Sequence, residues 1–384
     1  MTGDGGGPDR AALGKLAAVS ETAPPVRLRP EILKVPAYRQ GAAPTKPGYK
    51  LSSNENPFPP LPSVLDAIAA QARETNRYAG AAMPELRAGI AEEFGEGSHA
   101  VHLAAGSVAI LYQLVHAAAG PGDEFVYAWP SFEAYPALGL ASGATAVTVP
   151  LNEQAEHDLD AMAAAVTDRT RVILLCTPNN PTGPAIRRAD FDRFMARVPA
   201  DTLVVLDEAY REFVTNPEAV RGEDVLGAHP NLVVLRTFSK AYGLAQLRIG
   251  YGVGDPSILA AAATAAIPLS VTGIAESAAL ASLEPAARTE LEARVTEISA
   301  RRDALAARLR ELGVAIPAAQ GNFVWVPQGT GTGEILDAAA LAADFAESGT
   351  LVRPFPGHGV RISVGEPESL DEVVRVVGEH LAAR

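Results

Sequence analysis

A lysine and an arginine lie eight residues apart in this chain, with two hydroxyl side chains just before the lysine. Lys240 follows a short apolar run that predicts a buried strand. Thr237 and Ser239 lie between this run and Lys240. Open α/β sheets bind ligands at the carboxyl ends of their strands, so we expect Lys240 to face a cleft. A lysine there can form a Schiff base, and the hydroxyls with Arg248 suit a phosphate dianion. Together these residues indicate a pyridoxal phosphate site, whereas a lone lysine after a strand is usually solvated.

Polar side chains follow other predicted strands as well. Asp207 comes directly after the apolar run LVVL, which is unfavourable for a carboxylate unless it faces a cation such as a protonated pyridine nitrogen. Tyr210 is close enough to the same edge to donate to the oxygen of that ring. Asn180 lies in the stiff turn CTPNNPTG, which would fix an amide side chain. As isolated features, Asp207 and Tyr210 are also compatible with a structural ion pair and a core tyrosine.

Three further positions are weaker signals. Gly106 and Ser107 join the apolar run VHLAA to a helical pattern, so their amides and the helix N-terminus form a potential anion site. Phe132, in the segment PSFEAYP, is placed to lie over a flat cofactor, although an aromatic residue there is as often part of the core. Tyr78, in the loop NRYAG, is either a functional residue or a tyrosine packed on a turn, and spacing alone does not distinguish the two.

The chain between Val101 and Gly254 alternates short apolar runs with helical patterns. This alternation predicts an α/β fold with a mostly parallel sheet and helices on both faces. Glycines at 250, 252 and 254 resemble half of a dinucleotide fingerprint, but they interrupt a strand and precede Asp255-Pro256. We therefore expect no nicotinamide site.

The C-terminal third predicts a smaller α+β domain. An alanine-rich helical pattern from Thr272 to Leu312 suits a connector helix, and three short strands surround a helix at 336–347. Ser369 and Glu372 have the spacing of a capping box for the last helix.

We expect four parts in the chain. These are a flexible tail at 1–30, an N-terminal arm at 31–62 that contributes to the small domain and to a dimer contact, a large pyridoxal-phosphate-binding domain at 63–272, and the connector with the small domain at 273–384.

Composition excludes several classes of protein. Apolar residues make up 48% of the 384 residues, yet no apolar run approaches membrane-spanning length, and the start MTGDGGGPDR lacks the apolar core of a signal peptide. A formal charge of −13 argues against nucleic acid as a partner. The single cysteine, Cys176, excludes an intramolecular disulfide and a cysteine-based metal site. We expect a cytoplasmic protein with no metal and no membrane partner.

Two arginines near the C-terminus are candidates for binding an anion. Arg361 lies in the alternating pattern VRISV, where an arginine is unfavourable unless its planar fork meets a carboxylate or a phosphate. Arg353 lies in the preceding predicted strand.

The motifs CTPNNPTG, LDEAYREF, RTFSKAYGLAQLRIG and VRISVG, in this order, resemble those of the fold-type-I pyridoxal-phosphate aminotransferases. The segments LSSNENPFPP, GDEFVYAWPSFEAYP, HDLDAM and NFVWV narrow the resemblance to the histidinol-phosphate aminotransferase-like branch, and within it to the actinobacterial aromatic amino-acid aminotransferases. The resemblance covers the chain from about Leu33 to the C-terminus.

This resemblance implies a role for each candidate residue. Lys240 would bond the cofactor and later move the proton, and Asp207 would hold the ring nitrogen protonated. The ring would also be contacted by Asn180, Tyr210 and Phe132. The phosphate would be held by Gly106, Ser107, Val108, Thr237, Ser239, Arg248 and, across a homodimer, Tyr78 of the partner subunit. The substrate would be bound by Arg361 at its carboxylate, and by Arg353, Asn54, Asn180 and a partner-donated Tyr38.

The expected reaction is transamination between an aromatic or similarly bulky amino acid and a 2-oxo acid. Histidinol-phosphate transamination is an alternative, because Arg361 and Arg353 could hold a carboxylate or a phosphate equally well. Another pyridoxal-phosphate activity on the same scaffold also remains open. Ala79-Gly80 and Gln246 depart from the family pattern near the expected site, which would suit an enzyme recruited to an unusual amino acid in specialised metabolism.

Overall fold

The computed structural model describes residues 26–33, 46–79, 84–95, 99–329 and 336–383. Internal contacts divide the chain into two units, 1–40 and 41–384. In the first unit the described residues contain the short exposed helix α1 (Pro30–Leu33). The candidates Tyr38 and Gly80 lie outside the described residues. All elements discussed below belong to the second unit.

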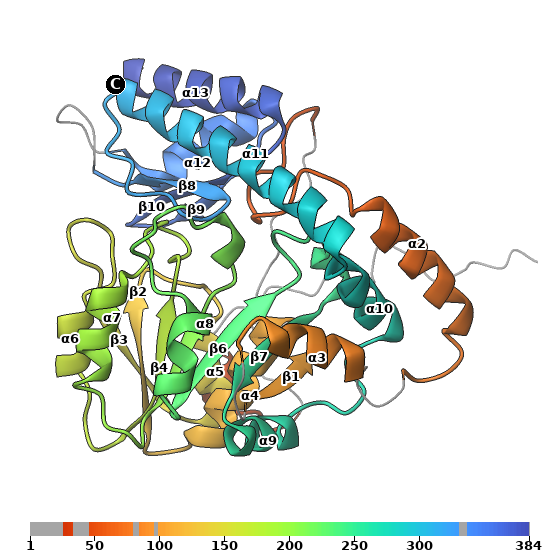
Figure 1. The fold of residues 1–384 in the computed structure, drawn as a ribbon. Helices are drawn as coiled ribbons and strands as arrows, with labels where there is room; N and C mark the ends of the chain where they lie inside the picture. Colours follow the sequence, from red (N-terminus) through yellow and green to blue (C-terminus); the bar gives the residue numbers. More distant parts are fainter. Residues whose placement is uncertain (1–25, 34–45, 80–83, 96–98, 330–335, 384) are drawn as a thin grey trace, which may run out of the picture. The chain divides into compact units, whose positions relative to one another are not determined.

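A seven-stranded sheet forms the centre of the second unit (Figure 1). Its strand order is β1-β7-β6-β5-β4-β2-β3. Strands β2 to β6 pair in parallel, whereas β7 is antiparallel to both β1 and β6. The bounds are β1 Ala100–Ala104, β2 Glu124–Trp129, β3 Thr145–Pro150, β4 Thr170–Cys176, β5 Leu203–Asp207, β6 Leu232–Thr237 and β7 Gly250–Gly254. The mostly parallel sheet expected from the sequence is confirmed.

Helices cover both faces of this sheet. Successive side chains of a strand point to opposite faces, and Val205 and Leu206 of β5 accordingly belong to different hydrophobic clusters. One cluster contains Phe191 and the other contains Ile110, from helices on opposite faces. The helices are α2 Pro62–Gln71, α3 Pro84–Glu92, α4 Ser107–Ala118, α5 Tyr135–Ser142, α6 Leu159–Ala164, α7 Arg188–Met195, α8 Gly222–Val225, α9 Pro256–Thr264 and α10 Gly273–Ser282, with 3₁₀ turns η2 Ala72–Glu74, η3 Arg211–Phe213, η4 Leu226–Ala228 and η5 Ala245–Leu247.

A second, three-stranded antiparallel sheet lies near the C-terminus. Its order is β8-β10-β9, with β8 Phe323–Pro327, β9 Arg353–Phe355 and β10 Gly359–Ser363. The helices α11 (Pro285–Glu311), α12 (Ala338–Glu347) and α13 (Pro367–Ala382) share one hydrophobic cluster with it (Figure 1). The segment 46–61 joins this layer, because Lys50 forms a bridge with Leu351. The three predicted strands around a helix are present.

Two predictions at helix ends were wrong. The single connector helix expected from Thr272 to Leu312 is two helices, because Pro285 has no amide hydrogen and begins a new helix after α10. The predicted capping box at Ser369 is absent, because α13 already begins at Pro367. The Ser369 hydroxyl instead donates to the carbonyl oxygen of Glu366 at 2.6 Å.

Among the described residues, no helix is both long enough and apolar enough to cross a membrane.

Candidate active site

Lys240 lies three residues beyond the end of β6. Its amine donates to the backbone oxygen of Ser53 at 3.1 Å and lies 5.7 Å from the centre of the Tyr210 ring. Burial, and after it the positive charge of Arg361, lower the pKa of this amine to about 7. A substantial fraction of the amine is therefore uncharged near neutral pH, which is the form that attacks a carbonyl.

Asp207 ends the neighbouring strand β5 and is 2% exposed. Its Oδ2 accepts a hydrogen bond from the Tyr135 hydroxyl at 3.0 Å, and its Oδ1 is buried with no partner in the part of the chain that the structure describes. Burial raises the pKa of this carboxyl to about 6, against the lowering effect of Tyr135. A buried acceptor of this kind fits the protonated ring nitrogen of pyridoxal phosphate.

Hydroxyls and a guanidinium gather beside the N-terminus of α4. The Thr237 hydroxyl donates to Ser239 Oγ at 3.0 Å, and Nη1 of Arg248 donates to the same oxygen at 3.2 Å. Gly106 precedes the helix with φ of 84°, and a Cβ atom there would collide with Nη2 of Arg248. The glycine thus keeps the guanidinium close to the first helical amides, at 107–108. These groups suit a phosphate, because they combine donors, a fixed positive charge and the helix dipole.

An aromatic pair joins this region to the neighbouring loop. Phe132 is half-buried and packs edge-on against Tyr135, with ring centres 5.6 Å apart. Tyr135 is the residue that binds Asp207, and burial raises its own pKa well above the usual value. The tyrosine therefore stays protonated and remains a donor to the carboxylate.

Tyr210 and Asn54 form a buried polar contact close to the lysine. Nδ2 of Asn54 donates to the Tyr210 hydroxyl at 2.9 Å, and Oδ1 of Asn54 accepts from the hydroxyl of Ser363 at 2.9 Å. Burial raises the pKa of Tyr210, so its hydroxyl keeps a proton that it can donate. This contact connects β10 to the residues around Lys240.

Arg361, in β10, is 5% exposed and reaches the same region. Its Nη1 donates to Oδ1 of Asn180 and its Nη2 donates to the backbone oxygen of Ser52, both at 2.6 Å. The sequence placed Arg361 and Asn180 at one site, and the structure brings them into contact.

Arg353 has a partner that the sequence did not suggest. Its Nε lies 2.9 Å from Oε2 of Glu133, and its Nη2 lies 2.7 Å from Oε1 of the same carboxylate. Arg353 was expected to face the substrate, but its charge is engaged by a residue of the loop after β2. Tyr78 is 82% exposed in its own chain.

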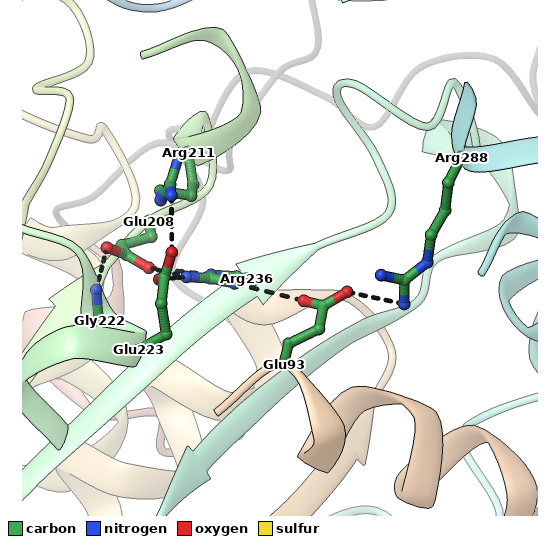
Figure 2. A network of polar contacts seen from close by, with 7 residues as sticks. All are labelled: Glu93, Glu208, Arg211, Gly222, Glu223, Arg236 and Arg288. Carbon is green, nitrogen blue, oxygen red and sulfur yellow. Dashed lines mark hydrogen bonds and ion pairs between the residues drawn. The ribbon is translucent and has the colours of Figure 1, made fainter. Parts of the chain in front are cut away.

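A network of ion pairs and hydrogen bonds lies at the ends of β5 and β6 (Figure 2). Glu208 directly follows Asp207, and Arg236 directly precedes Thr237. Because side chains alternate along a strand, Glu208 and Arg236 point to the face opposite that of Asp207 and Thr237. Nε of Arg236 donates to Oε2 of Glu208 at 2.9 Å, and Nη1 contacts Glu93 at 3.4 Å. The network is completed by Arg211, Gly222, Glu223 and Arg288. Sequence reasoning did not find this network, although two adjacent charged positions at buried strand ends were its signal.

Comparison with known proteins identifies the family of this chain. The family model for class I and II aminotransferases matches residues 46–377. The protein named aromatic amino acid aminotransferase from Streptomyces avermitilis is 48% identical over 361 residues, which are 93% of this chain and 98% of that protein. The protein of the same name from Thermobifida fusca is 47% identical over 361 residues, with the same coverage of both chains.

A solved structure gives the same fold. The histidinol-phosphate aminotransferase from Sinorhizobium meliloti, in complex with pyridoxal-5'-phosphate, aligns with a TM-score of 0.79 at 26% identity. The alignment covers 95% of this chain and all of that one. Fold and site therefore define a pyridoxal-phosphate-dependent enzyme of fold type I. The chain belongs to the class I and II aminotransferase family and is an aminotransferase.

Proposed function

We propose that this enzyme transfers the amino group of an aromatic, or similarly bulky, L-amino acid to a 2-oxo acid. The observation that carries the proposal is the 48% identity to the Streptomyces avermitilis aromatic amino acid aminotransferase over 98% of that protein. The buried Arg361 beside Asn180 supports it, because a guanidinium fork suits the α-carboxylate of an amino acid.

We propose that Lys240 and Asp207 are the central catalytic groups. Pyridoxal phosphate, when bound, accepts the electron pair that remains on the α-carbon after its proton is removed. Lys240 removes that proton and returns one, since its amine lies 5.7 Å from the centre of the Tyr210 ring and within the electrostatic influence of Arg361. Asp207 would keep the ring nitrogen protonated through Oδ1, which has no partner among the described residues.

The remaining residues position the cofactor and the substrate. Phe132 would pack against the ring of the cofactor, and Asn180 and Tyr210 would bind its oxygen. The phosphate would be held by Gly106, Ser107, Val108, Thr237, Ser239 and Arg248. The substrate carboxylate would be held by Arg361, with Asn54 and Arg353 on the substrate side. The predicted role of Tyr38 falls outside the described residues.

We also propose a homodimer. Tyr78 is exposed, and its neighbour Ala79 lies beside Gly273, where an added Cβ would be 3.6 Å from that of Ala79. The preceding segment exposes Ile267 and Leu269, which are 76% and 66% accessible. Exposed apolar side chains close to a site loop suit a two-fold interface in which Tyr78 completes the partner's phosphate site.

The domain division expected from the sequence, with a large domain at 63–272 and a small domain at 273–384, is kept as a proposal. It is supported by the two separate sheets and by the hydrophobic cluster of the second sheet. A cytoplasmic location likewise stays a prediction.

A substrate panel tests the proposed reaction. Purified enzyme with pyridoxal phosphate should show its highest kcat/KM on phenylalanine or tyrosine, with a 2-oxo acid acceptor. Histidinol phosphate is the competing substrate, and Lys240→Ala supplies the inactive control with most core packing intact. An enzyme that is fastest on histidinol phosphate would overturn the aromatic assignment.

A further inference from the structure

Arg353 and Arg361 face the same side of the three-stranded sheet. They are directly opposite each other in the pairing of β9 with β10. In an antiparallel pair, opposite residues project from the same face, with Cβ atoms roughly 5 Å apart. Arg361 uses that face to reach Asn180. Arg353 therefore extends toward the same site, beside a second positive charge.

Glu133 meets Arg353 from the other sheet. It follows Phe132 in the loop between β2 and α5, and its two oxygens contact Nε and Nη2 of the guanidinium. A second contact holds the same two segments together, because Trp129 packs edge-on against His358 with ring centres 6.4 Å apart. The end of β2 with the loop after it thus meets β9 with the turn after it.

The carboxylate of Glu133 occupies the edge of Arg353 that a substrate anion would use. Nε and Nη2 form the fork that binds a carboxylate or a phosphate through two parallel hydrogen bonds. A substrate with an anionic side chain must displace Glu133 from this fork and then lie close to its negative charge. An uncharged side chain requires neither change.

We propose that Glu133 determines the substrate class by neutralising Arg353. This inference rests on the proposed aminotransferase function and deepens it. Arg361 receives the α-carboxylate, and the Glu133–Arg353 pair makes the side-chain end of the site electrically neutral. The site then favours amino acids with uncharged side chains and disfavours a phosphate or a second carboxylate. The pair can still exchange, because the two side chains are 25% and 21% exposed rather than sealed in the core.

The test compares amino donors in the half-reaction, followed by the change in cofactor absorption. Glu133→Gln keeps the size of the side chain but removes the negative charge that Glu133 places on Arg353. We expect the ratio of kcat/KM for glutamate to that for phenylalanine to rise by about 10-fold or more, and the ratio for histidinol phosphate to rise with it. Succinate should also inhibit the variant more strongly than the parent. Glu133→Ser serves the same purpose if the glutamine variant is unstable.

Two further variants separate specificity from structure. The double variant Glu133→Gln/Arg353→Gln should return the ratio to that of the parent, because the released cation is gone. Glu124→Gln breaks a comparable pair with Arg169 at the other end of β2, and it should leave the ratio unchanged. This control measures how the loss of an ion pair elsewhere in the protein affects the ratio.

The outcomes distinguish the inference from the function on which it rests. A parent enzyme that uses neither phenylalanine nor tyrosine refutes the proposed function, whatever Glu133 does. A parent that uses them, with a ratio that stays within about 2-fold in folded Glu133→Gln, refutes the role of Glu133 alone. A ratio that rises equally in the double variant refutes it too, because the gain would not come from Arg353.

Discussion

The hydroxyl of Tyr135 donates to Oδ2 of Asp207 at 3.0 Å, while Oδ1 of the same carboxylate is buried without a partner among the described residues. A carboxylate with one such oxygen destabilises the protein that lacks its cofactor. The same oxygen is available for the charged ring nitrogen of pyridoxal phosphate. The same buried carboxylate therefore lowers the stability of the protein without cofactor and raises its affinity for the cofactor.

The first prediction concerns the stability of the apoprotein. The pKa of Asp207 is raised from 3.8 to about 6, so folding favours its protonated form, and stability falls as the pH rises between these values. Asp207→Asn removes the charge and should stabilise the apoprotein above pH 6 by about 1–3 kcal/mol, with no gain near pH 4. Urea unfolding at both pH values measures this, with the exposed Asp201→Asn as control. An equal gain at both pH values would contradict it.

The same substitution should abolish most of the activity. Asparagine cannot hold the ring nitrogen protonated by a full negative charge, so the loss falls on the step in which charge develops. We expect kcat to fall by about 100-fold or more while cofactor remains bound at high concentration. Near-normal turnover in Asp207→Asn would remove Asp207 from the catalytic site.

The second prediction is the pH dependence of Lys240 in the apoprotein. Because its pKa is lowered to about 7, the amine loses its proton as the pH rises through that value. Its rate of reaction with trinitrobenzenesulfonate should therefore rise between about pH 6 and 8 and then level off. Peptide mapping after short exposures measures the rate, with the exposed Lys46 as an internal reference. The prediction fails if both lysines show one profile.

The third prediction concerns Arg361. Lysine in its place keeps the charge but cannot form two parallel hydrogen bonds with a carboxylate. We expect kcat/KM on phenylalanine to fall by roughly 10-fold to 1000-fold, with cofactor binding retained. Arg375→Lys, on the exposed side of α13, provides the control. An unimpaired Arg361→Lys enzyme would exclude this residue from substrate binding.

The fourth prediction concerns the network of Figure 2. Arg236 lies among Glu208, Glu93 and Glu223, whereas Glu208 has Arg236 as its partner in an ion pair. Arg236→Met leaves buried carboxylates uncompensated and should lower the free energy of unfolding by about 3–5 kcal/mol. Glu208→Gln should have a smaller effect, because Arg236 keeps two carboxylates. Denaturant unfolding measures the free energy of unfolding of both variants. A larger loss in Glu208→Gln than in Arg236→Met would contradict this account of the network.

The sequence predicted local features well and long-range contacts poorly. The apolar run before Asp207 indicated one buried strand and the run before Lys240 indicated another, because these signals act over a few residues. The break at Pro285 was missed because the helical composition continues on both sides of it.

Contacts between distant segments left no local signal. Tyr135 and Asp207 are 72 residues apart, and Glu133 and Arg353 are 220 apart. Nothing in the segment PSFEAYP indicates that its tyrosine meets a carboxylate or that its glutamate meets an arginine. The backbone oxygens of Ser52 and Ser53, which accept from Arg361 and Lys240, could not be predicted either, because every residue has such an oxygen.

The measurement that tests the central claim most directly is the location of the cofactor on the chain. Reduction of the holoenzyme with borohydride fixes pyridoxal phosphate to the amine that bonds it, and mass spectrometry of the peptides identifies that residue. The account predicts a single modified peptide containing Lys240, and no modified peptide in the Lys240→Ala protein. A cofactor fixed to any other lysine in the native enzyme would contradict it.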